Sequence, residues 1–178
     1  MKIIGRIKNM FKKDVLPDTV IEDGYEIKRD GADAPKEIKS KDIVFFELEF
    51  STLNMTDAVC GIEPGEYKYK ANLSGESVIV DIKSYPHSAQ ASRRIVSADN
   101  TFLPRVQEIA DRFNVAGFNG IYHEVAGLPD FCGAQIFVCY ASGEKITAFD
   151  NQDMFLDIEM LLEYKKLFES VLQGKCEA

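Results

Sequence analysis

Residues 65–83, GEYKYKANLSGESVIVDIK, decide the fold class of this chain. On either side of Ser74-Gly75, apolar side chains occupy every second position, and mostly polar or charged residues lie between them. A period of two is typical of β-strands with one buried face and one solvated face. The Ser-Gly dipeptide between the two runs predicts a turn, so this stretch predicts a hairpin in an antiparallel sheet.

Three further segments show strand patterns. Residues 43–51 alternate between apolar and polar side chains, and residues 134–141 and 145–149 flank a second turn at Ser142-Gly143. The first segment predicts a single strand and the other two predict a hairpin.

Two segments have the 3.6-residue period of amphipathic helices. The first covers 102–113, with Asp99 or Asn100 as its N-cap, and the second runs from about Asp153 to Leu172. We therefore expect an α+β domain at 43–178 with two layers, in which helices cover one face of an antiparallel or mixed sheet. Including the N-terminal elements, the order is α-(ββ)-β-β-β-α-β-β-α.

The N-terminal part differs from this domain. Residues 1–13 have apolar side chains at helical spacing and predict a basic amphipathic helix. Residues 14–42 are rich in charges, prolines and glycines and predict a connector. A weak hairpin is predicted within it, because two short apolar runs flank Asp23-Gly24.

The charge balance excludes some partners and some locations. The net charge is −8, yet the first 13 residues carry five of the 21 Lys and Arg residues and no acid. An acidic body repels the phosphate backbone, so we expect no nucleic-acid partner. No segment has the apolar length of a signal peptide or a membrane span, so we expect a cytoplasmic protein with reduced cysteines.

The run from Phe102 to Phe149 resembles an uncharacterised bacterial domain family of hypothetical proteins. The resemblance lies in the helix, the Gly117-Phe118-Asn119 segment, the Leu128-Pro129-Asp130 turn and the hairpin that follows. The family often has Trp before the glycine-aromatic segment, where this chain has Val115-Ala116. The resemblance supports the order of the elements and implies no activity and no site residue.

The connector at 114–133 is the first place to look for a site, because long loops in compact domains often carry function. It contains His123, Glu124, Asp130 and Cys132, the residue types of a Cys-His nucleophile pair or a small metal site. These four are weak catalytic candidates. The alternative is an ordinary surface loop, since neither a zinc-ligand spacing nor a signature around the cysteine is present.

We expect no metal and no cofactor. Asp150, Asp153, Asp157 and Glu159 cluster at the predicted start of the last helix. A carboxylate cage for a divalent cation is one interpretation of them, but these carboxylates suit the N-terminal turn of a helix without any cation, and the glycine and ligand spacing of a calcium loop is absent. Neither of the two common phosphate-binding glycine motifs occurs.

The leading functional hypothesis is a non-enzymatic protein-interaction module that presents its polar sheet face or its N-terminal arm to a protein partner or a second copy. An immunity-like protein that masks a basic toxin is one version of it. One alternative is an enzyme or small-ligand binder with a site at the 114–133 loop. Another is peripheral membrane contact through residues 1–13.

Overall fold

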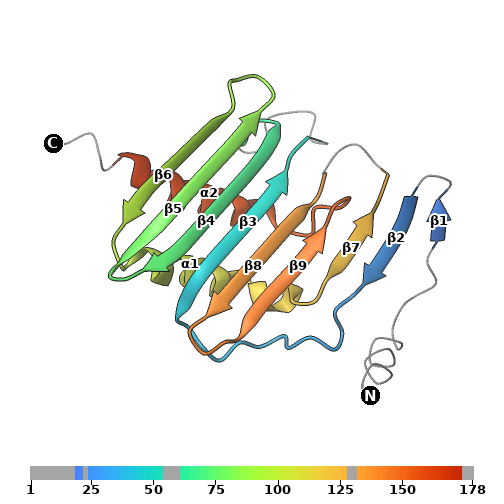
Figure 1. The fold of residues 1–178 in the computed structure, drawn as a ribbon, viewed down its shortest axis with the longest axis horizontal. Coiled ribbons are helices and arrows are strands. Elements are labelled where there is room, and N and C mark those ends of the chain that lie inside the picture. Colours follow the sequence, from blue (N-terminus) through green and yellow to red (C-terminus); the bar gives the residue numbers. More distant parts are fainter. Residues whose placement is uncertain (1–18, 22–23, 54–60, 128–131, 174–178) are drawn as a thin grey trace, which may run out of the picture.

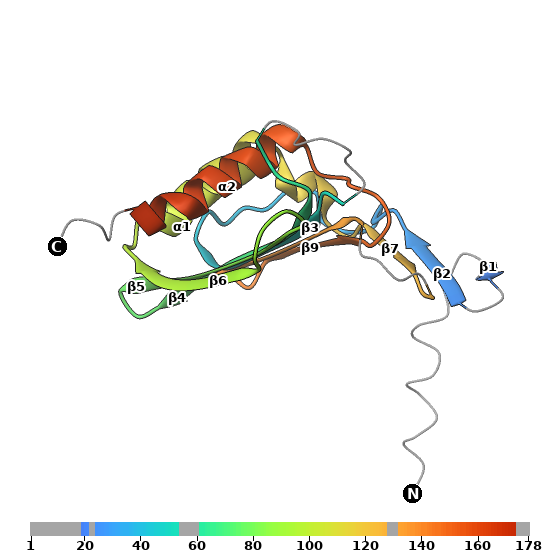
Figure 2. The same cartoon turned by 90° about the horizontal axis from the view of Figure 1, so that it is seen from above.

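The structure is a computed structural model that describes residues 19–21, 24–53, 61–127 and 132–173. Within these residues, nine strands form one sheet in the order β1-β2-β7-β9-β8-β3-β4-β5-β6, which can be followed in Figure 1. The two α-helices of the described residues both lie on one face of this sheet (Figure 2). The predicted α+β class with helices on one face is confirmed, and the predicted helix at 1–13 lies outside the described residues.

The elements have the following bounds. They are β1 (Thr19–Ile21), β2 (Gly24–Arg29), β3 (Ile43–Ser51), β4 (Gly65–Ser74), β5 (Ser77–Pro86), β6 (Ser92–Ala98), α1 (Phe102–Arg112), the short 3-10 helix η1 (Val115–Phe118), β7 (Tyr122–Val125), β8 (Ala134–Tyr140), β9 (Lys145–Asp150) and α2 (Ile158–Gln173).

Neighbouring strands are antiparallel except for β7 and β9, which run parallel, so the sheet is mixed. The β4–β5 hairpin has the register that its alternation predicts, with Lys68 opposite Lys83 and Tyr69 opposite Ile82. The second predicted hairpin is β8–β9. Strands β1 and β2 also pair, as the weak hairpin pattern predicts, and join the same sheet through β7.

The core lies between the helices and the long strands. Phe168 of α2 is its centre: its ring lies 5.9 Å from that of Phe46, 5.0 Å from Tyr69 and 5.1 Å from Phe102. All four side chains are buried. Aromatic rings at these separations add to the stabilisation that comes from apolar burial, and they fasten α2 to α1 and to the sheet.

Two strands are absent from the predicted order. β6 was not expected because it is an edge strand, and most of its side chains are exposed, so no apolar alternation marks it. β7 lies inside the segment expected to be a loop, and with four residues it is too short to show a period. Both segments are strands because they form backbone hydrogen bonds with neighbouring strands, and this pairing is not visible in the local sequence.

The last helix begins later than predicted. α2 starts at Ile158, where the carboxylate of Asp157 accepts a hydrogen bond of 2.7 Å from the Glu159 amide. Asp150 is therefore the last residue of β9 and Asp153 lies in the segment that follows it, so their predicted place at the helix terminus is wrong. The Asp150 carboxylate accepts hydrogen bonds from two backbone amides in this segment, those of Gln152 and Asp153.

Residues 30–42 connect β2 to β3 and pass along one end of β9 and β8 (Figure 1). We call this segment the strap. Its Lys39 and Ser40 amides both donate to the carboxylate of Glu144, in the β8–β9 turn. At its start, Gly31 lies so close to Gly120 that a Cβ on Gly31 would come within 2.4 Å of the Gly120 carbonyl carbon. The strap thus packs closely against the segment before β7 at its start and is hydrogen-bonded to the β8–β9 turn near its end.

Candidate functional site

A buried histidine lies between two carboxylates where β2, β7 and β9 run side by side. His123 of β7 is 7% exposed, and its Nδ1 lies 3.1 Å from each carboxylate oxygen of Asp150 on β9. Its Nε2 lies 3.0 Å from Glu26 Oε1 on β2. Cross-strand register produces this arrangement. His123 is opposite Asp150 in the β7–β9 pair, and in the β2–β7 pair Glu26 is two positions from Lys28, the residue opposite His123, so it points to the same face.

Asp150 is held in place by the turn that follows it. Its Oδ1 accepts the backbone amides of Gln152 at 2.9 Å and Asp153 at 2.8 Å. On the other side, Gly133 approaches so closely that a Cβ there would lie 1.8 Å from the Asp150 carbonyl oxygen. The absence of a side chain at Gly133 therefore lets β8 begin directly beside the site.

The next residue ties β7 to this turn. Asn151 Oδ1 accepts the Val125 amide at 2.9 Å, and its Nδ2 donates to the Val125 carbonyl at 2.8 Å. The Asn151 amide donates to the His123 carbonyl at 3.1 Å. A side-chain amide that bonds both backbone groups of one residue extends the short β7–β9 pairing, and it keeps the imidazole facing Asp150.

A third carboxylate borders the histidine. Within the described residues, one group of histidine, cysteine and acidic side chains has a geometry that suits a cation: His123, Asp150 and Asp153, with one ligand atom from each lying within 4.8 Å of the others. Asp153 is exposed while the other two are buried. The group is therefore open to solvent on the Asp153 side.

The sequence candidates at 114–133 do not converge on one point. Glu124 lies on the opposite face of β7, where it accepts hydrogen bonds from Tyr122 and from Tyr25. The bond to Glu124, followed by burial, raises the pKa of Tyr122 to about 12. The backbone amide of Cys132 donates a hydrogen bond to the Asn151 carbonyl. The two ring nitrogens of His123 contact Asp150 and Glu26, so they do not form the Cys-His pair that the sequence suggested. Asp130 lies outside the described residues.

Glu26 and Asp150 are the partners that sequence reasoning missed. They are 97 residues before and 27 residues after His123, respectively, and no local spacing links them. Glu26 belongs to a segment that the sequence predicts to be a connector.

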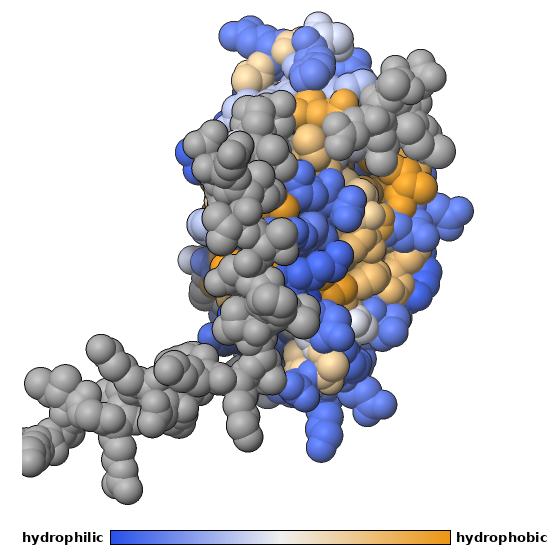
Figure 3. All heavy atoms as spheres, turned by 90° about the vertical axis from the view of Figure 1, so that its right-hand side faces the viewer, coloured by the Kyte–Doolittle hydropathy of each residue, from blue (hydrophilic) through white to orange (hydrophobic). Residues whose placement is uncertain are grey.

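The end of the sheet that carries β1, β2 and β7 faces the viewer in Figure 3. Hydrophilic side chains gather in the middle of this view, beside a band of hydrophobic ones.

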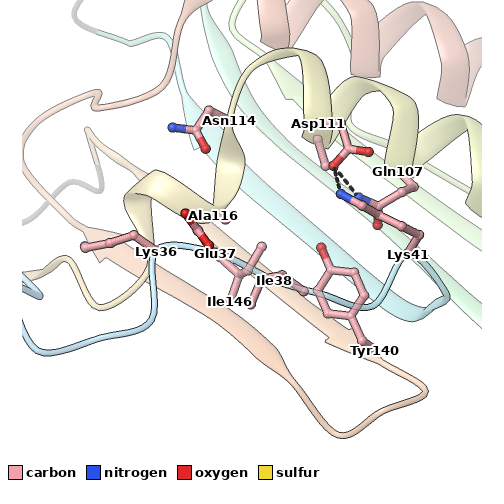
Figure 4. Close-up of a pocket in the computed structure, with 11 residues that line it drawn as sticks. Lys36, Glu37, Ile38, Lys41, Gln107, Asp111, Asn114, Ala116, Tyr140 and Ile146 are labelled. Atoms are coloured by element: carbon pink, nitrogen blue, oxygen red, sulfur yellow. Dashed lines mark hydrogen bonds and ion pairs between the residues drawn. The ribbon is translucent and has the colours of Figure 1, made fainter.

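A second site-like feature is a pocket of about 280 Å³ between the strap, α1 and the sheet (Figure 4). Asn114 and Ala116 line it from the predicted loop, and Lys41 and Asp111 form an ion pair of 2.6 Å at its side. Gln107 is 6% exposed and also lines it; its Nε2 donates to Asp111, but its Oε1 has no partner among the described residues. Burial raises the pKa of Tyr140, another lining residue, to about 12.

The third feature is the sheet face opposite the helices, which we call the open face; Figure 1 looks onto it. Six of its charged side chains pair with one another: Lys68 with Glu47 and Glu49, Lys70 with Glu47, and Arg93 with Asp81. Burial alone would raise the pKa of Glu47, but hydrogen bonds from the two lysines outweigh it and leave that pKa lowered.

Apolar side chains on the open face remain uncovered within the described part of the chain. On β5 and β6, Ile79 is 38%, Tyr85 48% and Ile95 57% exposed. All three point away from the helices, because the alternate positions Val78, Val80 and Ile82 are buried.

Comparison with protein-family models, with curated proteins and with solved structures finds no match to this chain. The resemblance to an uncharacterised bacterial family thus stays a prediction. Among the described residues, no helix has the length and apolar character needed to cross a membrane.

Proposed function

We propose that the chain is a protein-interaction module that binds its partner through the open face. The observation that carries this proposal is the exposure of Ile79, Tyr85 and Ile95 on a sheet face that no described helix covers. Ile79 and Ile95 are diagonal neighbours across the β5–β6 pair, and Tyr85 lies further along β5 on the same face. Apolar side chains that are neighbours on one surface favour a protein interface, whereas single ones need no explanation.

The charges of this face favour one kind of partner. Because three basic and three acidic side chains of this face are already paired with one another, they offer little net charge to attract an oppositely charged surface. The partner would therefore present an apolar contact surface, and binding would depend only weakly on salt. In the immunity-like version, the acidic charge that attracts a basic toxin would have to come from another surface.

The test is site-specific photo-crosslinking in a lysate of cells that express the protein, adjusted to low or high salt. A photoreactive phenylalanine analogue replaces Ile95 on the open face, or Glu108 on the exposed side of α1 as the matched control. We expect an adduct of defined mass at position 95 in both low and high salt, and none at position 108. Twice the mass of the chain would identify the partner as a second copy.

Two variants connect the adduct with the apolar surface. Ile79→Ser weakens the adduct at position 95, while Lys145→Ser, at an exposed position of the more distant β9, leaves it unchanged. Equal adducts at positions 95 and 108, or an adduct that disappears in high salt, would contradict the proposal.

The pocket beneath the strap supports a second candidate, a small-ligand binder. Gln107 Oε1 is a buried acceptor without a described partner at the pocket wall, and such a group favours a ligand that carries an N–H or O–H donor. Small hydroxyl and amide compounds can be screened for a rise in melting temperature. Compounds that stabilise the wild type and not Gln107→Leu would support this function, and equal stabilisation of both proteins would exclude the site.

A further inference from the structure

We propose that His123, Asp150 and Asp153 bind a divalent transition-metal ion such as Zn²⁺, with Glu26 as the outer carboxylate that orients the histidine. This site is distinct from the open face, because His123, Asp150 and Glu26 lie on the side of the sheet that faces the helices. It does not depend on the interaction proposed above.

The first argument is the number of protons on the imidazole. Both ring nitrogens of His123 face carboxylate oxygens, at 3.1 Å for Asp150 and 3.0 Å for Glu26. A neutral imidazole has a single N–H and donates to only one of these carboxylates, whereas an imidazolium donates to both. A cation between Nδ1 and Asp150 takes the place of the second proton and leaves the N–H on Nε2 to donate to Glu26.

The second argument is the pattern of the inner and outer ligands. Metal-binding histidines commonly donate their second ring N–H to a carboxylate, which fixes the tautomer and the ring orientation. Glu26 occupies that position, and its side chain is 36% exposed, compared with 8% for His123. The buried nitrogen Nδ1 faces Asp150 and is the one left to bind the ion.

The third argument is that the three ligand atoms already lie close to one another. Asp150 Oδ1 accepts two backbone amides, and Oδ2 lies 3.1 Å from His123 Nδ1. Asp153 brings its ligand atom within 4.8 Å of the other two. Ligand atoms that each lie about 2 Å from one ion are at most about 4 Å apart, so three atoms within 4.8 Å of one another need to move by about 1 Å at most to bind one ion.

The ligand types indicate the metal. One imidazole nitrogen favours Zn²⁺ over Mg²⁺ and Ca²⁺, which prefer oxygen ligands only. Zn²⁺ should also bind more tightly than Mn²⁺ at such a site, following the general order of affinity. Because Asp153 is exposed, the coordination positions left by three protein ligands face solvent.

The experiment is calorimetric titration of the metal-free full-length chain with Zn²⁺, Mn²⁺ and Mg²⁺. We expect one site per chain, tightest for Zn²⁺. Asp153→Asn should weaken Zn²⁺ binding more than the roughly 10- to 100-fold that the loss of an outer partner costs, and Glu26→Gln should fall in that range. Asp157→Asn, an exposed carboxylate that caps α2, is the control and should leave the affinity unchanged.

Cobalt distinguishes this site from the cysteines. Co²⁺ bound to nitrogen and oxygen ligands gives weak visible bands, whereas a bound thiolate adds an intense charge-transfer band in the near ultraviolet. We expect the weak bands alone, and their loss in Asp153→Asn. Absence of Zn²⁺ binding, equal binding by Asp153→Asn and wild type, or a thiolate band would overturn the proposal.

Discussion

The two ends of the sheet are held together in different ways. β4 and β5 pair along ten residues each, and their alternate side chains enter a continuous apolar core. At the other end, β7 has four residues and meets β9 at two register positions. There, polar contacts from His123 and Asn151 take the place of apolar burial. Apolar packing thus defines one end, and buried polar contacts define the other.

The largest loss of stability should follow from a substitution that creates a cavity in the apolar end of the sheet. Phe168→Ala removes a fully buried ring that contacts Phe46, Tyr69 and Phe102, and should lower the free energy of unfolding by about 3–5 kcal/mol. Urea unfolding followed by circular dichroism measures the loss. Phe137→Ala, on the open face and partly exposed, is the control and should cost much less. Equal losses would show that the open face is buried in solution.

The apolar end is also the part that the sequence predicts well. The alternation around Ser74-Gly75 depends on which side chains meet the core, so it identifies both strands and their hairpin. The same rule cannot find β6, whose side chains are mostly exposed. The site at the polar end joins Glu26, His123 and Asp150, which become neighbours only when the sheet forms. His123 was among the catalytic candidates, Asp150 was noted only as a carboxylate near the last helix, and Glu26 was not noted at all.

The second-largest loss of stability should be confined to the polar end of the sheet. Asp150→Ala leaves the His123 ring and the amides of Gln152 and Asp153 without their acceptor, at a cost of about 1–3 kcal/mol. Hydrogen exchange should show faster exchange of β7 and β2 amides, with β4 and β5 unchanged. Asp153→Ala is the control, because its exposed side chain should matter little in the metal-free protein. Equal acceleration across the whole sheet would mean that the two ends unfold as one unit.

A smaller change, in this case a gain in stability, should come from removing a buried polar atom in the apolar end of the sheet. Tyr164 is fully buried, its hydroxyl has no partner among the described residues, and burial raises its pKa well above the usual value. Tyr164→Phe removes the unsatisfied group and should stabilise the protein by about 1 kcal/mol. Tyr67→Phe is the matched control: its hydroxyl donates to the Glu63 carbonyl at 2.8 Å, so its loss should destabilise. A destabilising Tyr164→Phe would mean that the hydroxyl has a partner in solution.

The smallest effect should come from the ion pairs of the open face. Glu47 contacts Lys68 at 2.9 Å and Lys70 at 2.6 Å, and the pKa of its carboxyl is lowered from 4.5 because these hydrogen bonds outweigh burial. Glu47→Gln should cost about 0.5–1 kcal/mol at pH 7, since partly exposed ion pairs contribute little. Urea unfolding of both proteins from pH 7 to acid pH measures the difference.

The pH dependence of that difference identifies its cause. Because the pKa of Glu47 is lower in the folded protein than in the unfolded chain, its contribution is complete above 4.5 and is lost as the pH falls through the folded value. Wild type and Glu47→Gln should therefore converge in acid, while Glu76→Gln, in the exposed β4–β5 turn, should match the wild type throughout. A difference that stays constant with pH would mean that side-chain packing, rather than charge, is what Glu47 provides. The open face would then depend on packing in the same way as the apolar core, and its paired charges would set its solubility rather than its stability.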